Sequence, residues 1–246
     1  MALKASPADQ ALLLDLQAID TKLAQLTHKG TSLPQHAAIA ALATEISALR
    51  IVELEQRGAR EDVQTELGRL ESDVAVVEAR IARDTERMQS STSAKDAQAF
   101  EHELGLLAKR QFDLEEIEIT VMERLEEKES ELAATTTRIN ELLATSATLE
   151  AERDAELNTI EAERKHSGAN RQTIAAKVPA DLLALYERQR ERYGTGASHL
   201  RFGVSSANGV KLLENEMQAI RQAAPDEVIM CASSEAILVR TAESGL

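Results

Sequence analysis

The segment "QSSTSAKDAQ", residues Gln89 to Gln98, separates two long runs of hydrophobic residues that repeat with alternating spacings of four and three. In the run from 42 to 88, ten of fourteen such positions are Leu, Ile, Val or Met, and in the run from 100 to 160 eleven of eighteen are apolar. This heptad spacing predicts two helices that bury one face in a coiled coil. Because the turn between them is short, the helices must run antiparallel, so the sequence predicts a long coiled-coil hairpin.

Start and stop residues predict the ends of three helices, which we expect at about 7–28, 35–88 and 94–165. Ser6 caps the first helix, Gly30 follows its end, Pro34 opens the second helix and Ser93 caps the third. The leucines of the first helix also need a partner. The nearest surface for them is the base of the hairpin, near Leu142 to Ile160.

The hydrophobic frame of the second helix has four polar exceptions, at Glu53, Gln56, Arg60 and Asp84. The first three are consecutive in the frame, so we expect the seam to be looser there. Apolar residues such as Val52 lie next to these positions. The sequence leaves open whether the hydrophobic repeat shifts locally so that these neighbours are buried instead.

The composition changes after residue 165. His166 to Gln172 has the character of a linker, Val178 to Gly194 is a short helix, and Val228 to Arg240 is typical of a β-hairpin. We therefore divide the chain into a helical coiled-coil hairpin over 1–166 and a small α+β domain over 172–246. A domain this small usually needs a metal, disulfides or a docking surface to be stable.

Composition and charge limit the function. The chain has 246 residues, 2% aromatics, no tryptophan and a formal net charge of −14. Few aromatics favour long helices over a thick core, and the negative charge disfavours nonspecific wrapping of nucleic acid. No stretch has the length of a signal peptide core or a membrane span, so we expect a cytoplasmic protein with no membrane partner. The single cysteine excludes an internal disulfide.

The chain contains five informative stretches: LLLDLQAIDTKLAQL, SLPQHAAIAAL, HELGLLAKRQFDLEE, VPADLLALYERQRERYGTGASHLRFG and AAPDEVIMCASSEAILVR. In these stretches it resembles a bacterial family with a long coiled-coil hairpin and a C-terminal zinc ribbon of four cysteines. Members of that family are usually described as nucleic-acid-binding. The resemblance implies a mainly α fold, in which an N-terminal helix and the antiparallel hairpin are joined to a small zinc-ribbon-like α+β domain.

The family's zinc is held by two Cys-x-x-Cys turns. Carried over to this chain, these ligand positions are Ser205, Asn208, Cys231 and Ser234. Serine hydroxyls and a neutral amide are not structural zinc ligands of useful strength. We therefore expect a degenerate ribbon that holds no zinc and no other cofactor, with hydrophobic contacts in place of the metal. Cys231 is then a buried, inert residue, because its sequence neighbours offer no cation to activate the thiol.

A basic stretch with adjacent aromatic residues gives candidate nucleic-acid contacts, since arginine and tyrosine together can bind phosphate and stack on a base. These residues are Arg188, Arg190, Arg192, Arg201 and Tyr193. The alternative is that Arg188 and Arg192, four residues apart, pair with glutamates of the same helix or of the acidic hairpin.

We find no residue pattern of an enzyme. His102 and Glu103 begin a zinc-protease motif, but position 106 is Leu where that motif needs a second histidine. We predict a non-enzymatic adaptor that binds protein partners through the hairpin and the degenerate ribbon, and nucleic-acid binding is the alternative. The polar turn of the hairpin gives candidate partner contacts at Ser90, Ser93, Lys95 and Asp96.

Overall fold

The computed structural model describes residues 3–246 and confirms the predicted fold class, a mainly helical chain with a small sheet region. The elements in chain order are α1 (Pro7–Thr31), α2 (Pro34–Ser90), α3 (Ala94–Ala175), α4 (Ala180–Tyr193), β1 (Ala197–Arg201), β2 (Val204–Ser205), α5 (Glu214–Gln222), β3 (Ile229–Met230), β4 (Ile237–Val239) and the 3₁₀ helix η1 (Ala242–Ser244). Two compact units result. The hairpin unit is Gln35–Ala151, and the mixed unit combines Met1–Pro34 with Glu152–Leu246.

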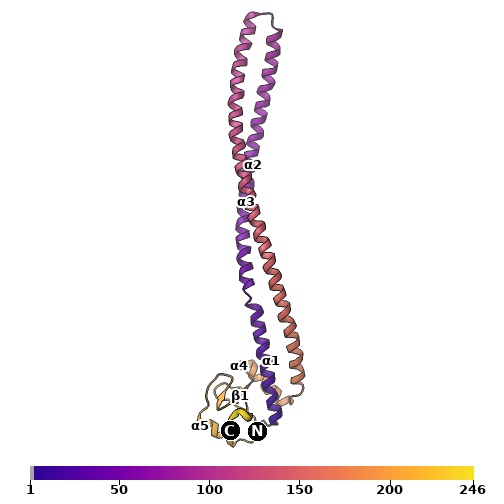
Figure 1. Ribbon diagram of the computed structural model, residues 1–246, viewed down its shortest axis with the longest axis vertical. Helices are drawn as coiled ribbons and strands as arrows, with labels where there is room; N and C mark the ends of the chain where they lie inside the picture. The colour runs from indigo at the N-terminus through magenta and orange to yellow at the C-terminus, as the bar shows by residue number, and fades with distance from the viewer. Residues whose placement is uncertain (1–2) are drawn as a thin grey trace. The chain divides into compact units, whose positions relative to one another are not determined.

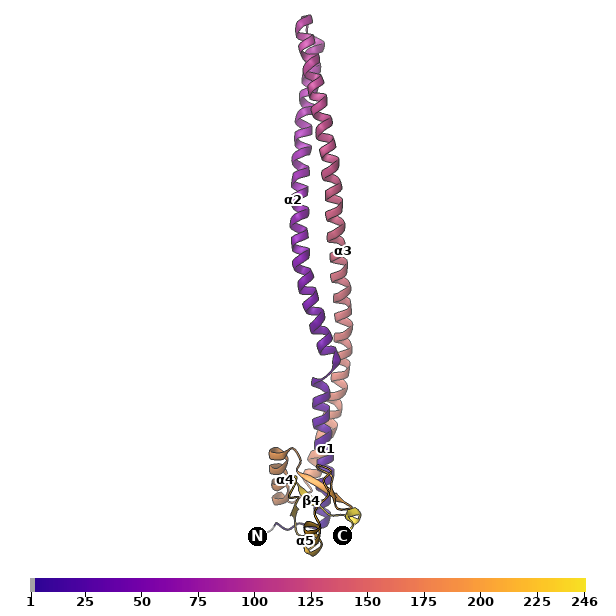
Figure 2. The ribbon, with the colours of Figure 1, turned by 90° about the vertical axis from the view of Figure 1, so that its left-hand side faces the viewer.

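In the hairpin unit, α2 and α3 lie side by side and run antiparallel (Figures 1 and 2). Ion pairs between the helices show the antiparallel register, because the partner on α3 moves back along the chain as the residue on α2 moves forward. These pairs are Glu45 with Arg138, Arg60 with Glu129 and Glu66 with Arg124. The long antiparallel coiled-coil hairpin is therefore confirmed.

The buried residues of the hairpin fall on the predicted heptad frame. Ile46 packs with Ile139 and Leu142, while Val63, Leu114 and Val121 are also buried. At the polar part of the seam, Thr136 donates a hydrogen bond to Glu53 at 3.2 Å. The helix does not shift phase there to bury its apolar neighbours, since Ile51, Val52 and Leu54 are 62%, 39% and 69% exposed.

Two predicted helix ends are wrong. Helix α1 continues through Gly30 to Thr31, with Leu157 and Ile160 of α3 packed beside that glycine. Helix α3 extends ten residues beyond 165, so the predicted linker His166–Gln172 is helical. The reason is tertiary, because Arg171 in this segment is bound to α1 and α4. The predicted division of the chain at 166–172 accordingly differs from the compact units observed.

The mixed unit contains a four-stranded sheet in the order β2-β1-β4-β3. β1 and β4 are parallel, whereas β1–β2 and β3–β4 are antiparallel, and the latter pair is the hairpin expected at Val228 to Arg240. Both faces of β4 are buried. Ile237 and Val239 face a cluster that includes Leu13 and Leu16 of α1, and Leu238 faces a second cluster around α5.

The expected partner surface of α1 is only partly right. Ile160 is close to the end of α1, but Leu142 packs in the hairpin unit against Ile46. Leu13 and Leu16 instead share a core with Leu182 and Tyr186 of α4 and with the sheet. Helix α1 is therefore an integral part of the mixed unit.

A buried polar network joins three helices of this unit. The Asp20 carboxylate of α1 accepts from Arg171 of α3 at 2.6 and 3.0 Å and from the Tyr186 hydroxyl of α4 at 2.7 Å. Arg171 also donates to Glu187 at 2.6 Å. The hydrogen bond to Asp20 raises the pKa of Arg171, and burial together with Asp20 raises the pKa of Tyr186, so both groups keep their protons.

The sheet is attached to the same network. Gln17, one turn before Asp20, accepts hydrogen bonds from the backbone amides of Gly196 at 2.7 Å and Ala197 at 3.3 Å. A Cβ atom at Gly196 would lie 2.5 Å from the Tyr186 ring, so this position requires glycine. The start of β1 is thereby held between α1 and α4.

We predict that Asp20→Ala destabilises the mixed unit by about 3 kcal/mol, because it leaves Arg171 and Tyr186 without their buried acceptor. Urea unfolding followed by tyrosine fluorescence measures this unit, which contains both tyrosines of the chain. The matched control is Asp15→Ala, an exposed acid of the same helix. Equal unfolding midpoints for the two variants would contradict the assigned role of Asp20.

Candidate functional site

Two turns of the mixed unit share one hydrogen-bond pattern. The Gly209 amide donates to the Ser205 carbonyl at 2.9 Å, and the Glu235 amide donates to the Cys231 carbonyl at 2.8 Å. A second bond closes each turn, from the amide of the first residue to the carbonyl five positions later, at 3.0 and 2.9 Å. Gly209 and Glu235 both have left-handed φ values, +67° and +56°. The two turns are therefore equivalent in backbone geometry.

The structure brings the side chains of these turns together. Asn208 of the first turn donates to the Ser233 hydroxyl of the second at 3.0 Å, and that hydroxyl lies 3.3 Å from the Cys231 sulfur. Ser205 and Cys231 are both buried, and Ser234 is partly buried. The four positions singled out by the resemblance thus belong to one cluster.

The donor atoms in this cluster do not fit zinc, which takes four thiolate or imidazole ligands in structural sites. The Ser205 hydroxyl is already hydrogen-bonded to Ser198 at 2.7 Å, and the cluster has one thiol. Across residues 3–246, no three His, Cys, Asp or Glu side chains are grouped in a way that can hold a metal ion.

The environment of Cys231 affects its ionisation. Burial raises the pKa of the thiol, but the hydroxyls of Ser233, Ser234 and Ser205 around it favour the thiolate and together lower the pKa to about 7. The Ser234 hydroxyl is buried without a hydrogen bond of good geometry, and it is thus free to turn toward the sulfur. The thiol itself is only 1% exposed, so solvent reagents have little access to it.

The candidate nucleic-acid contacts do not form one patch of free charges. Arg190 pairs with Glu187 at 2.8 Å and lies 3.4 Å from Asp20, and Arg201 pairs with Glu243 at 3.0 Å. The other three residues are exposed, and the Arg192 guanidinium lies 5.2 Å from the centre of the Tyr193 ring. Within residues 3–246, no acidic side chain pairs with Arg188, unlike the alternative expected from its spacing.

The four candidate contacts at the hairpin turn divide into two roles. The Ser90 hydroxyl donates to the Arg87 carbonyl at 3.1 Å, and the Ser93 hydroxyl accepts from the Asp96 amide at 3.4 Å. These serines therefore shape the turn. Lys95 and Asp96 have exposed side chains, so they are the charged groups at this turn that a partner can reach.

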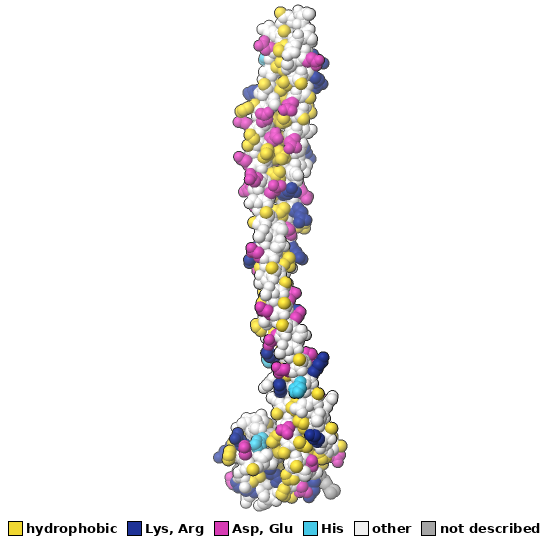
Figure 3. Space-filling model, turned by 45° about the vertical axis from the view of Figure 1, so that its right-hand side comes forward, with side chains coloured by type: hydrophobic (Ala, Val, Ile, Leu, Met, Phe, Trp, Pro, Cys, Tyr) yellow, Lys and Arg dark blue, Asp and Glu magenta, His cyan; other side chains and the backbone are white. Residues whose placement is uncertain are grey.

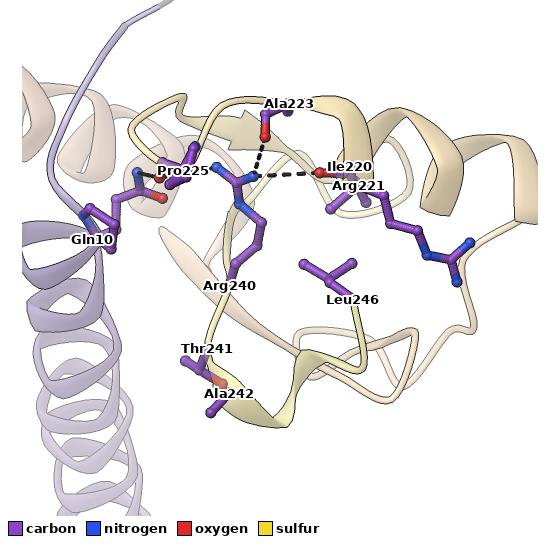
Figure 4. A pocket seen from close by; sticks show the side chains of 10 residues that line it. Gln10, Ile220, Arg221, Ala223, Pro225, Arg240, Thr241, Ala242 and Leu246 are labelled. Carbon is purple, nitrogen blue, oxygen red and sulfur yellow. Dashed lines mark hydrogen bonds between the residues drawn. The ribbon is translucent and has the colours of Figure 1, made fainter.

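A pocket of about 440 Å³ lies between α1, α5 and the C-terminal segment (Figure 4). Arg240 lies beside it with Leu246 nearby. Its guanidinium donates to five backbone carbonyls, those of Ile220, Ala223, Ala224, Pro225 and Glu227. Arg240 thus binds the loop after α5 to the end of β4, and its terminal nitrogens are occupied by this structural role.

This fold and these clusters define a coiled-coil hairpin protein with an N-terminal helix and a small mixed α+β unit. Residues 16–194 match the CT398-like coiled coil hairpin domain, and the chain belongs to that family. Among residues 3–246, none of the helices is both long enough and apolar enough to cross a membrane.

Relatives support the family over nearly the whole chain. An uncharacterized protein of Mycobacterium tuberculosis is 34% identical over 239 residues, which are 97% of this chain and 98% of that protein. A solved structure from Mycobacterium smegmatis has a TM-score of 0.83 and 30% identity, covering 97% of this chain and 100% of that one. CT398 from Chlamydia trachomatis has a TM-score of 0.61 and 16% identity, with coverage of 94% and 97%, which shows the same fold.

The expected hairpin family is thus confirmed. The zinc-ribbon ancestry and the binding of nucleic acid remain predictions. Sequence reasoning missed the network of Asp20, Arg171 and Tyr186. One signal for it was available, since Asp20 lies four residues after Leu16 on the apolar face of the first helix, where a carboxylate needs a buried partner.

We predict that Cys231 makes folding stability depend on pH. Its pKa is lowered from 9.0 to about 7 by folding, so its contribution is fully present above pH 9 and is lost as the pH falls through 7. The difference in unfolding free energy between the protein and Cys231→Ala should therefore grow between pH 7 and 9, by at most about 2.5 kcal/mol. Denaturant unfolding at several pH values measures it. A difference that stays constant would show that the thiol remains protonated.

Proposed function

We propose that the protein is a non-enzymatic adaptor that binds protein partners through its hairpin unit and its degenerate ribbon. The main support is the exposure of large hydrophobic side chains on the hairpin, including Leu54, Leu106 and Phe112. A pair of helices needs only its seam residues for its own stability. Among the exposed hydrophobic residues, Ile119 and Met122 line one groove, and a group of this kind is typical of surfaces that another molecule covers.

The mixed unit offers a second contact surface. Phe202 is 71% exposed and has φ +46°, a backbone conformation that is unfavourable for a bulky residue. Leu213 is also exposed. Strain at an exposed aromatic residue favours a binding role, because the side chain is held outward at a cost to the fold.

The proposed ribbon is stable without a metal. Leu200, Leu212, Met217, Ile220 and Leu238 form a buried cluster with Cys231 beside the two equivalent turns. Full burial of such side chains stabilises by roughly 1.5–3 kcal/mol each, or about 7–15 kcal/mol together. This gross gain, from which the entropy cost of ordering the chain must be subtracted, supports the proposal that hydrophobic contacts hold the turns.

Photo-crosslinking from the hairpin turn tests the adaptor proposal directly. With a photo-crosslinking amino acid in place of Lys95, we expect one or a few proteins to be captured in cells and identified by mass spectrometry. The matched control carries the same group at Lys4, an exposed lysine of the mixed unit. No captured protein at Lys95 would remove the turn as a partner site.

Nucleic-acid binding is the second candidate function. It is supported by Arg188, which is exposed and pairs with no acidic side chain of residues 3–246, and by Arg192, which lies over the Tyr193 ring. This combination can hold a phosphate and stack a base. The net charge of −14 opposes it, so binding would depend on this small local surface.

An electrophoretic mobility-shift assay with single-stranded DNA and RNA, at low and high salt, tests the nucleic-acid-binding alternative. If these residues bind nucleic acid, Arg188→Ala with Arg192→Ala should abolish a shift that salt also weakens. The control is Arg201→Ala, whose charge is already paired with Glu243. The absence of any shift at low salt would exclude this function.

A further inference from the structure

The outer face of α3 carries hydrophobic side chains beside a groove. Phe112, Ile119 and Met122 are 59%, 58% and 52% exposed. Their spacings of seven and three residues place them on one face of the helix. Ile119 and Met122 line a groove of about 400 Å³, which is also lined by Leu67 of α2 and Leu125 of α3.

These exposed residues are separate from the seam that holds the hairpin together. The seam residues Leu114 and Val121 are both 2% exposed. Ile119 and Met122 can therefore be replaced without opening the contact between α2 and α3. Burying each of them against another molecule would stabilise a complex by up to about 1.5–3 kcal/mol.

The groove has an acidic rim. Glu123, Glu126 and Glu129 line it together with the hydrophobic residues, and because Glu129 is paired with Arg60 of α2 at 3.2 Å, Glu123 and Glu126 supply the negative charge of the rim. The segment 113–131 contains nine acidic residues and two basic ones, and both basic residues are engaged, Arg124 with Glu66 and Lys128 with Glu131. Figure 3 shows acidic and hydrophobic side chains next to one another along the hairpin helices. We call this combination of residues 112–129 of α3 with Leu67 the acidic groove.

The charge identifies the kind of molecule that fits. A second copy of this chain would place the same carboxylates against each other, and such like-charge contacts cost several kcal/mol. A helix with hydrophobic residues at i, i+3 or i+4 and i+7, and with Lys or Arg on either side of them, satisfies both the hydrophobic floor and the acidic rim. We propose that the acidic groove binds a basic amphipathic helix of a partner protein. The inference rests on the proposed adaptor function and adds the chemistry of one partner surface.

A synthetic peptide tests this proposal on the full chain. The probe is a fluorescein-labelled amphipathic helix of about 18 Leu and Lys residues, long enough to be helical when bound. Two controls are a peptide of the same composition with its leucines spread around the helix, and an amphipathic peptide of Leu and Glu. In fluorescence anisotropy titrations, only the first peptide should bind with saturation, and salt should weaken its binding.

Two pairs of variants locate the site. Ile119→Ser with Met122→Ser should weaken binding at least about tenfold, since it removes two hydrophobic contacts. Glu123→Gln with Glu126→Gln should weaken it and reduce its dependence on salt. The matched control is Ile51→Ser with Val76→Ser, which changes two hydrophobic residues outside the groove that are each 62% exposed. It should leave the affinity unchanged.

Several results would overturn the proposal. These are equal binding of either control peptide, unchanged affinity of Ile119→Ser with Met122→Ser, or a dimer in sedimentation equilibrium that this double variant abolishes. The last result would place a second copy in the groove. The crosslinks from Lys95 are independent of these residues. Persistent crosslinks without peptide binding would thus reject the acidic groove alone, and peptide binding without crosslinks would reject the turn alone.

Discussion

Asp20 places a carboxylate on the buried face of α1, and the mixed unit is built around the groups that satisfy it. A buried carboxylate without partners costs several kcal/mol, so its donors must come from elements packed against α1. Arg171 can reach it only if α3 remains helical well beyond the hairpin unit. Tyr186 can reach it only if α4 folds back beside α1. Gln17 of α1 accepts hydrogen bonds from two backbone amides at the start of β1. This strand is thereby held next to α1 and α4. One buried side chain therefore connects three helices, and its neighbour Gln17 adds the sheet.

This arrangement leaves the far side of the sheet to a second hydrophobic cluster. Ile237 and Val239 complete the core around α1 and α4, while Leu238 points to the cluster around α5 that contains Cys231. Because the first core already fixes β4 and β1, the two equivalent turns need only local hydrophobic contacts and hydrogen bonds to keep their form.

The sequence predicted the parts of the fold that depend on local repeats. Ile46, Val63, Leu114 and Val121 were identified as seam residues from heptad spacing alone, and all four are buried. The end of α3 was missed by ten residues, because its cause is a contact between Asp20 and Arg171, which are 151 positions apart in the chain. For the same reason, Arg190 was assigned to a basic patch although it belongs to the network around Asp20. The proximity of Ser205 to Cys231 could be expected only from the resemblance, since no sequence pattern around either residue indicates a contact with the other.

The two units differ in how they use charge. In the mixed unit the main arginines, Arg171 and Arg240, are bound by carboxylates or backbone carbonyls, so these charges serve the fold. In the hairpin unit the seam requires only a narrow apolar stripe, and acidic residues beyond those in ion pairs remain on the outside next to exposed hydrophobic side chains. Exposed hydrophobic residues favour association in general, but the acidic residues determine which kind of surface can associate with the hairpin. They repel phosphate backbones and a second copy of the chain, and they attract a basic surface. In the proposed complex, charge would therefore select the partner at a distance, and the hydrophobic residues would supply the affinity once contact is made.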